Sequence, residues 1–304
     1  MAHKRDLHQD VTNQIIRAIE AGACGDQWVM PWTAGAAGGM PHNATTGHRY
    51  RGVNVVMLWF EAQERAYPAN QWASYKQWHG AGAQVRKGER GTLIVYAGQT
   101  VVRDPAEGGE ENERTIRFLK CSHVFNAAQV DGYELPTVER PDLAERLAHA
   151  ERFVTATGAD IRYGQGRAFY SPSHDFVGMP DWDQFKDTDG ATATENAYGV
   201  LLHELTHWTK HERRLDRDLG GQRFGDDGYA MEELVAELGA AYLCASLGIA
   251  AEPRADHARY IENWLGVLKA DKKAIFTAAA RASDAAEYLE AFQGLAALND
   301  RKAA

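Results

Sequence analysis

The sequence is poor in cysteine and in long apolar runs, and each shortage excludes a class of protein. Its 304 residues include 3 cysteines. Three widely spaced cysteines do not build a disulfide framework, and reduced thiols indicate a cytoplasmic protein. No run of about 18 apolar residues occurs, so no segment is expected to span a membrane. Residues 1–14 carry positive charge without an apolar stretch behind them and are therefore not expected to be a secretory signal.

An excess of positive charge is also missing, because the formal net charge is -9. The charges are unevenly distributed, however. Residues 1–140 hold 15 Lys and Arg against 15 Asp and Glu, so the whole negative excess lies in the rest of the chain. Residues 42–103 hold eight Lys and Arg against three acids. A positive segment in the first half and an acidic second half indicate two domains with different partners.

The turn residues and the apolar periodicity predict an α+β protein of two domains. Residues 1–130 are expected to form an α+β domain, and residues 144–304 a mainly helical domain with a small sheet. Residues 131–143 are the predicted linker, because they contain two prolines and a glycine without periodicity. We expect helices at 8–21, 53–66, 69–80, 141–157, 194–212, 229–247 and across 255–295, and strands at 92–97, 115–125 and, as a pair, within 168–179.

The strongest chemical signal is the segment LLHELTHW, in which His203, Glu204 and His207 form the pattern H-E-x-x-H. Residues four apart lie on one face of a helix, so the two histidines can direct their imidazoles at one cation. Zinc takes neutral nitrogen ligands in tetrahedral geometry and keeps one position for water in a catalytic site. Glu204 is expected to lie beside that water.

A third ligand must come from elsewhere in the chain. His211 continues the series, but it is separated from His203 by about 12 Å of helix rise. The metzincin pattern also fails, because Lys210 stands at its glycine position and Arg213 at its third-histidine position.

The helix predicted at 229–247 offers carboxylates beside a row of small residues, which would allow a close helix approach. We predict Glu233 as the third ligand and Glu237 as the group that orients a histidine. The alternative is that Glu237 takes the ligand position. Glu232 lies 100° around the helix and is expected to face solvent.

This combination of H-E-x-x-H with a following helix of the form E-x-x-x-E resembles the gluzincin metallopeptidases. The resemblance implies that Glu204 is the general base, because zinc lowers the pKa of its water to about 7 and the glutamate accepts the proton. It also implies that a strand of the pair at 168–179 is an edge strand that aligns an extended peptide. Zinc is the expected metal, with manganese and cobalt as alternatives.

The first half combines aromatic and basic side chains, and five of the eight tryptophans lie within residues 28–78. Proteins that bind single strands without sequence preference combine a cationic groove with aromatic faces for the bases. No helix-turn-helix, zinc-finger or RNP signature occurs. A domain of this size also needs aromatic core residues, for which we choose Trp28, Trp32, Trp59 and Trp78. The predicted contacts to single-stranded DNA are Arg49, Tyr50, Arg51, Asn54, Trp72, Lys76, Arg86, Lys87 and Arg90.

Long composite motifs in both halves resemble the ArdC-type antirestriction proteins. They are PHNATTGHRYRGVNVVMLW, NQWASYKQ and VFNAAQVDG in the first half, and LLHELTHWTKHERRLDR and YAMEELVAELGAAYL in the second. The resemblance covers nearly the whole chain, although Lys210 stands where the family is expected to have glycine. It implies a protein of a mobile element in the recipient cytoplasm. Its first domain would bind single-stranded DNA and shield incoming DNA from host restriction endonucleases, and its second would be a zincin-like metallopeptidase domain.

Two other functions fit parts of the sequence. The first is a dedicated zinc metalloprotease whose amino-terminal domain recognises a protein substrate, such as a component of the host restriction system. The second is a metal-dependent nuclease, which the histidine-rich ligand set disfavours because two-metal nucleases use clustered carboxylates.

Overall fold

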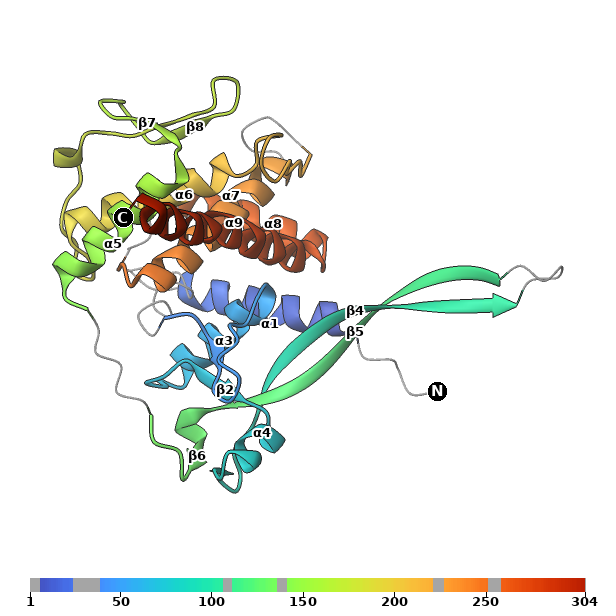
Figure 1. The fold of residues 1–304 in the computed structure, drawn as a ribbon. Helices are drawn as coiled ribbons and strands as arrows, with labels where there is room; N and C mark the ends of the chain where they lie inside the picture. The colour runs from blue at the N-terminus through green and yellow to red at the C-terminus, as the bar shows by residue number, and fades with distance from the viewer. Residues whose placement is uncertain are drawn as a thin grey trace.

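The computed structural model describes residues 6–23, 39–105, 111–135, 141–220, 227–250 and 258–303. Within these ranges the chain forms an α+β first half and a mainly helical second half (Figure 1). This agrees with the predicted fold class. Trp28, Trp32 and residues 136–140 of the predicted linker lie outside the described residues. None of the described helices is long and apolar enough to cross a membrane.

The first half contains a four-stranded sheet in the order β1-β2-β5-β4, with the helix α3 against β4, while α1 packs against α8 (Ala258–Ala270) of the second half. The sheet is mostly antiparallel, and β1 pairs with β2 in parallel. A second, two-stranded sheet joins β3 to β6. The elements are α1 (Leu7–Ala23), β1 (His42–Asn43), α3 (Val53–Glu64), β2 (Gln71–Ala73), α4 (Tyr75–Gly80), β3 (Gln84–Val85), β4 (Thr92–Pro105), β5 (Glu111–Asn126) and β6 (Val130–Asp131).

The predicted helix at 69–80 is wrong in its first half. Residues Gln71–Ala73 form β2, and the helix α4 begins only after Ser74. The hydroxyl of Ser74 accepts a hydrogen bond from the amide of Gln77, and the side-chain oxygen of Gln77 accepts one from the backbone N–H of Ser74. This capping box starts the helix at Tyr75. Trp72 and Ala73 are therefore adjacent strand residues. Both are buried, and they belong to two different apolar clusters.

The strands β4 and β5 are longer than predicted, and their register is continuous from Thr92↔Val124 to Pro105↔Glu111. Together they make a two-stranded ribbon that projects from the rest of the molecule (Figure 1). We refer to residues 96–105 and 111–120 of this ribbon as the arm.

The second half packs its helices together and carries a small sheet, in the order β7-β9-β8, against α6 at one end (Figure 1). The helices near 141–157, 194–212 and 229–247, those across 255–295, and the strand pair within 168–179 agree with prediction, whereas β7 was not predicted. The elements are α5 (Leu143–Thr157), β7 (Asp160–Arg162), β8 (Phe169–Ser171), β9 (Phe176–Gly178), α6 (Ala193–Trp208), α7 (Asp227–Leu247), α8 (Ala258–Ala270) and α9 (Ala274–Ala303).

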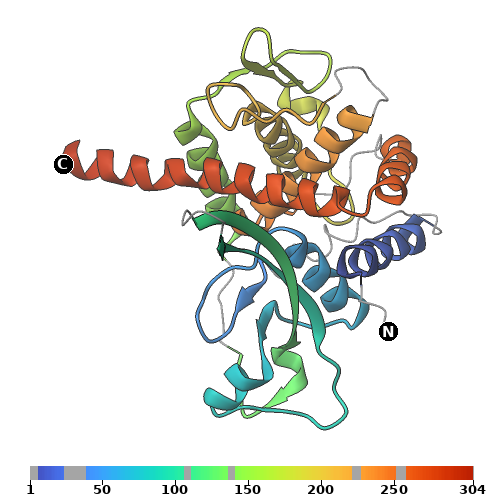
Figure 2. The ribbon, with the colours of Figure 1, turned by 90° about the vertical axis from the view of Figure 1, so that its right-hand side faces the viewer.

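The two halves share one apolar core. A single cluster of buried side chains includes Val11 of α1, Trp59 of α3 and Tyr242 of α7. The rings of Trp59 and Tyr242 lie 5.6 Å apart. Polar contacts add to the docking, since Thr12 donates a hydrogen bond to the carbonyl of Lys272 over 2.8 Å. Figure 2 shows α1 and α3 against the helices of the second half.

Candidate functional site

The helix α6 carries the H-E-x-x-H residues and begins at a capped amino terminus. Thr192 caps it, and Glu195 completes a capping box by accepting a hydrogen bond from the backbone N–H of Thr192. The side chains of His203, Glu204 and His207 are all buried. Buried polar side chains of this kind need partners, which come mainly from α7.

The helices α6 and α7 approach closely at one glycine. A Cβ atom on Gly239 of α7 would lie 2.5 Å from the methyl group of Thr206 on α6. The two helices run antiparallel, because His203 faces Glu237 and His207 faces Glu233. This crossing brings the carboxylates of α7 to the histidines of α6.

Glu233 lies between the two histidines. One of its carboxylate oxygens is 3.5 Å from Nε2 of His203, and the other is 3.5 Å from Nε2 of His207. Ligand atoms of the three side chains all lie within 4.8 Å of one another. In a tetrahedral site with metal–ligand bonds of about 2.0–2.1 Å, ligand atoms are about 3.4 Å apart. The three side chains therefore fit a divalent cation with one position left for water.

The charges in this cluster are strongly coupled. Burial opposes charge on the histidines, but the carboxylates of Glu233 and Glu237 raise the pKa of His203 to about 10. Glu233 and Glu232 likewise raise the pKa of His207 against the effect of burial. The two imidazoles in turn hold the pKa of the buried Glu233 far below its ordinary value. Protons therefore compete with a metal for the histidines, so metal affinity should decrease as the pH falls.

Glu237 lies beside His203, and its predicted role of orienting a histidine stays a prediction. Its Oε2 is 3.2 Å from Nδ1 of His203, which is an ion-pair distance. The negative charge of this carboxylate therefore favours the protonated form of the ring.

The prediction that Glu232 faces solvent is wrong. Glu232 is 8% exposed, and its Oε1 lies 3.0 Å from Nδ1 of His207. The guanidinium of Arg217 donates to both oxygens of this carboxylate, over 2.9 Å from Nε and 2.8 Å from Nη2. Arg217 itself donates to Thr209 and to the carbonyl of Thr206.

Sequence reasoning missed Glu232 and Arg217 because it treated the ligand-bearing face of α7 as a single line of residues. Two histidines one helical turn apart can instead contact two glutamates that are adjacent in the sequence, here Glu232 and Glu233. The adjacent pair of glutamates in the facing helix was the sequence feature that could have predicted this contact. His211 lies outside the site, as predicted, and its Nδ1 accepts a hydrogen bond from the amide of Arg213.

The edge strand β8 is tied to the end of α6. The hydroxyl of Tyr170 on β8 donates to Asp175 over 2.9 Å, and Arg214 donates to both residues. The guanidinium of Arg214 also stacks on Trp208 of α6 at 3.8 Å. Hydrogen bonds from Arg214 and Tyr170 keep the pKa of Asp175 below its ordinary value, although burial opposes them. These contacts hold β8, an edge strand of its sheet among the described residues, against the carboxyl end of α6.

The predicted role of Trp72 as a DNA contact is contradicted by its burial. The side chain is 0% exposed and packs with Leu58, Ala62 and Val124. A ring without exposed surface cannot stack on a base. Trp59 and Trp78 are also fully buried, in agreement with the predicted core.

Two other predicted DNA contacts have evident packing roles. The amide group of Asn54 donates to the carbonyl of Val95 and accepts from its N–H, both over 2.8 Å. Asn54 thus occupies both backbone groups of one residue on β4. Tyr50 is half-buried, its hydroxyl lies 3.4 Å from the carbonyl of Trp72, and burial raises the pKa of Tyr50.

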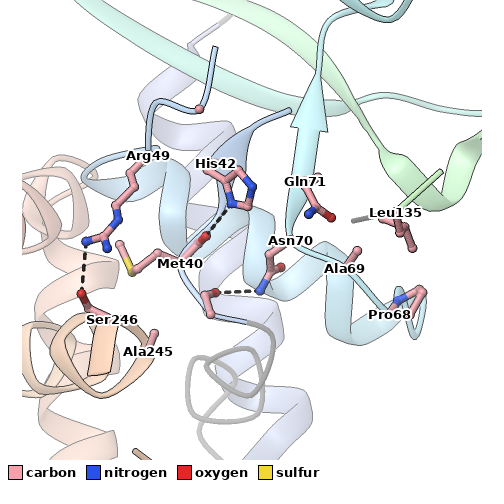
Figure 3. A pocket seen from close by; sticks show the side chains of 12 residues that line it. Met40, His42, Arg49, Pro68, Ala69, Asn70, Gln71, Leu135, Ala245 and Ser246 are labelled. Atoms are coloured by element: carbon pink, nitrogen blue, oxygen red, sulfur yellow. Dashed lines mark hydrogen bonds between the residues drawn. The ribbon is translucent and has the colours of Figure 1, made fainter. Parts of the chain in front are cut away.

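Arg49 and Arg51 point toward the second half. Arg49 forms an ion pair with Glu290 of α9 at 2.8 Å and donates to Ser246 of α7 at 3.2 Å. Arg51 forms ion pairs with Asp284 and Glu287 of the same helix. Figure 3 shows Arg49 reaching across a cavity of about 470 Å³ between the two halves. The side chains of Arg49 and Arg51 are 50% and 57% exposed, so the phosphates of a nucleic acid can reach both.

The remaining predicted contacts lie on the surface of the first half. Lys76, Arg86, Lys87 and Arg90 are all exposed. Arg86 and Lys87 line an open hollow with Tyr75, which is 49% exposed. Arg86 is paired with Glu89 at 2.9 Å, so its charge is partly neutralised.

Two families match the two halves of the chain. Residues 148–281 match the zincin-like metallopeptidases, and residues 5–125 match the N-terminal domain of the anti-restriction factor ArdC. The fold and the site therefore define a two-domain protein with a zincin-like metallopeptidase domain.

Two solved structures identify the family within this class of two-domain proteins. The metal-free crystal structure of the antirestriction ArdC protein from the R388 plasmid is 40% identical, with a TM-score of 0.75, and the alignment covers 95% of this chain and 98% of that chain. The chain belongs to the ArdC antirestriction family. The Mn(II)-bound structure of the same protein is 36% identical, with a TM-score of 0.73, over the same shares of both chains.

Two curated relatives differ in length. The protein y4eC of Sinorhizobium fredii is 46% identical over an alignment of 305 positions, which covers 98% of this chain and 96% of the relative. The DNA primase TraC of Escherichia coli is 40% identical over an alignment of 309 positions, which covers 95% of this chain but 27% of the primase.

Proposed function

We propose that this protein binds single-stranded DNA through its first domain and protects incoming DNA from host restriction endonucleases in the recipient cytoplasm. The observation that carries the proposal is the similarity to an antirestriction ArdC protein over 95% of this chain. The exposed cations of the first half support it, because a cationic surface is the first requirement for binding nucleic acid.

We further propose that His203, His207 and Glu233 hold a divalent metal, with Glu237 positioning His203. The spacing of the three ligand groups and the Mn(II)-bound relative support this. Zinc suits the two nitrogen ligands, and manganese and cobalt are the alternatives. A metal ion in such a site activates water as a nucleophile. The buried carboxylate of Glu204 would accept the proton, which makes peptide hydrolysis the reaction for which the site is equipped.

A second candidate function is a dedicated metalloprotease that acts on a protein of the host restriction system. The edge strand β8 favours it, because an extended peptide could add to its free edge beside α6. In that case the first domain would recognise the substrate protein.

The two candidates differ in whether hydrolysis is required. We would compare the wild type, Glu204→Gln and Glu212→Gln in a restricting recipient cell and count the transferred plasmids that survive. Glu212 is an exposed glutamate beyond α6 and serves as the matched control. Metal content and binding to an oligonucleotide would be measured for each purified protein.

We expect Glu204→Gln to retain its metal, its DNA binding and its protection of the plasmid. Loss of protection with intact metal and DNA binding would instead establish the metalloprotease function. Failure of the purified wild type to bind single-stranded DNA at low salt would refute the leading proposal.

A further inference from the structure

The arm exposes apolar and aromatic side chains on a ribbon that has few neighbours to bury them. Tyr96 is 66% exposed, Val101 54% and Ile116 37%. A two-stranded ribbon is marginally stable by itself, and exposed apolar side chains with open edges favour aggregation. Such a surface is retained most readily where it contacts a partner.

One face of the arm brings two aromatic rings together over a glycine. Tyr96 pairs across the ribbon with Lys120, and Gly98 pairs with Phe118, so these four residues share one face. A Cβ atom on Gly98 would lie 2.5 Å from the ring of Phe118 and 2.9 Å from that of Tyr96. The rings can therefore lie close to the backbone, with their centroids 6.3 Å apart.

The same face carries positive charge. The ammonium group of Lys120 lies 4.8 Å above the ring of Phe118, and Arg114 is exposed farther along the face. Of the four Lys and Arg in residues 92–103 and 114–124, Lys120 and Arg114 lie on this face by the alternation of the strands, and these two segments contain no Asp or Glu. Acidic residues begin only at the tip, with Asp104 and Glu113.

We propose that this face of the arm, formed by Tyr96, Phe118 and Lys120, binds single-stranded DNA by base stacking. The proposal rests on the single-strand binding proposed above and adds a site that the sequence motifs did not indicate. Unpaired bases stack on aromatic rings, and nearby cations contact the phosphates.

A duplex fits this face less well than a single strand. A two-stranded ribbon can enter the major groove, but it reads base edges there through side chains such as Arg, Asn and Gln. Tyr96 and Phe118 offer ring faces instead, which are useful only for bases that have left the stack. The aromatic cover over Gly98 also stabilises the ribbon itself, so a test must separate the two roles.

The test measures the affinity of the full chain for a labelled oligothymidylate by fluorescence anisotropy between about 50 and 200 mM salt. The variants are Tyr96→Ala, Tyr96→Phe, Phe118→Leu and Lys120→Gln. Phe118→Leu keeps apolar cover over Gly98 but removes the ring. Val101→Thr removes an exposed apolar side chain from the opposite face and is the matched control. Thermal unfolding of each variant checks that it is folded.

We expect Tyr96→Ala and Phe118→Leu each to weaken binding by about fivefold or more, the loss of one stacked base. Tyr96→Phe and Val101→Thr should bind as the wild type does. Lys120→Gln should reduce the slope of log affinity against log salt by about 0.7, the value for one phosphate contact on a single strand.

Three results would overturn the proposal. If the wild type binds and both aromatic variants bind equally well, the arm is not the site, although the proposed function stands. If duplex DNA competes as well as the single strand, stacking is not the mode of binding. If the variants change self-association but not DNA affinity, the face is a protein interface. A wild type that binds no single strand would refute the proposed function together with this site.

Discussion

The carboxylate of Glu232 supports the candidate metal site without being one of its three ligands. It accepts hydrogen bonds from Arg217 and lies against Nδ1 of His207, so Nε2 of that ring is left facing Glu233. A carboxylate behind a ligating histidine fixes the orientation of the ring and makes it a stronger base. The buried Arg217 keeps Glu232 ionised and lowers its pKa to about 2, despite burial.

We predict that Glu232→Gln lowers metal affinity about 10- to 100-fold, because the neutral amide no longer strengthens His207 as a ligand. The protein should also lose about 3 kcal/mol of unfolding free energy, since the buried Arg217 loses its counter-ion. Competition with a chromogenic chelator measures the first effect, and urea unfolding the second.

Glu212→Gln is the matched control, because this substitution removes the same charge from an exposed position. It should change neither quantity. Unchanged metal affinity in Glu232→Gln would show that His207 does not depend on this carboxylate.

At the scale of single residues, the two histidines on one helix and one carboxylate of the next helix were predictable, whereas side chains brought in by other tertiary contacts were not. His203, His207 and Glu233 follow from helical spacing and from the need for a third ligand. The contact of Glu232 with Arg217 depends on where the chain returns after α6, and spacing does not reveal that. The burial of Trp72 was missed because its strand was predicted to be a helix.

Among the elements, the crossing of α6 and α7 determines the geometry of the site. Gly239 lets the helices approach until Glu233 can face both histidines. A glycine inside a helix costs about 0.5–1 kcal/mol relative to alanine, so its presence here reflects packing.

We predict that Gly239→Ala destabilises the protein by about 1–3 kcal/mol, because the added methyl group overlaps Thr206 and a β-branched residue cannot move away easily. Metal affinity should fall as well, since α7 carries Glu233. Thermal unfolding and metal titration would measure the two effects.

Gly266→Ala in α8 is the matched control, because a Cβ atom there would meet nothing within 4 Å. It should leave metal affinity unchanged and stabilise the protein by up to about 1 kcal/mol. Equal behaviour of the two variants would mean that the helices can adjust and that Gly239 does not set their distance.

Element types were predictable where the periodicity was long, as in α6 and α7. They were less predictable where a short strand and a short helix follow one another, as at β2 and α4. There the capping box at Ser74 decides the boundary. The length of the β4–β5 ribbon was also missed, because its polar tip reads as a loop although its backbone remains paired.

For the whole molecule, the docking of the two halves affects how the first half can meet DNA. Arg49 and Arg51 were predicted from their position in a loop, but they are paired with acidic residues of α9. Ion pairs this exposed contribute about 0–1 kcal/mol each, so they are a weak restraint that phosphates can replace.

We predict that replacing Glu287 and Glu290 together by Gln raises the affinity for single-stranded DNA. The double change frees Arg49, leaves Arg51 with Asp284 as its one acidic partner among the ion pairs described above, and removes two repelling charges. The salt dependence should steepen by about 0.7 for each arginine that gains a phosphate. Anisotropy titrations at several salt concentrations measure both effects.

Glu262→Gln removes a charge from an exposed position on α8 and should have no comparable effect. If affinity and slope stay unchanged in the double variant, the two arginines serve only to join the halves.

The shared core has a consequence for whether the two domains can exist apart. Val11, Trp59 and Tyr242 belong to one apolar cluster, so separating the halves would expose apolar surface on both. The match to the TraC primase fits this view, because it spans 95% of the present chain inside a protein almost four times as long. The two domains thus form one packing unit, and a segment similar to both of them together is present in the longer relative.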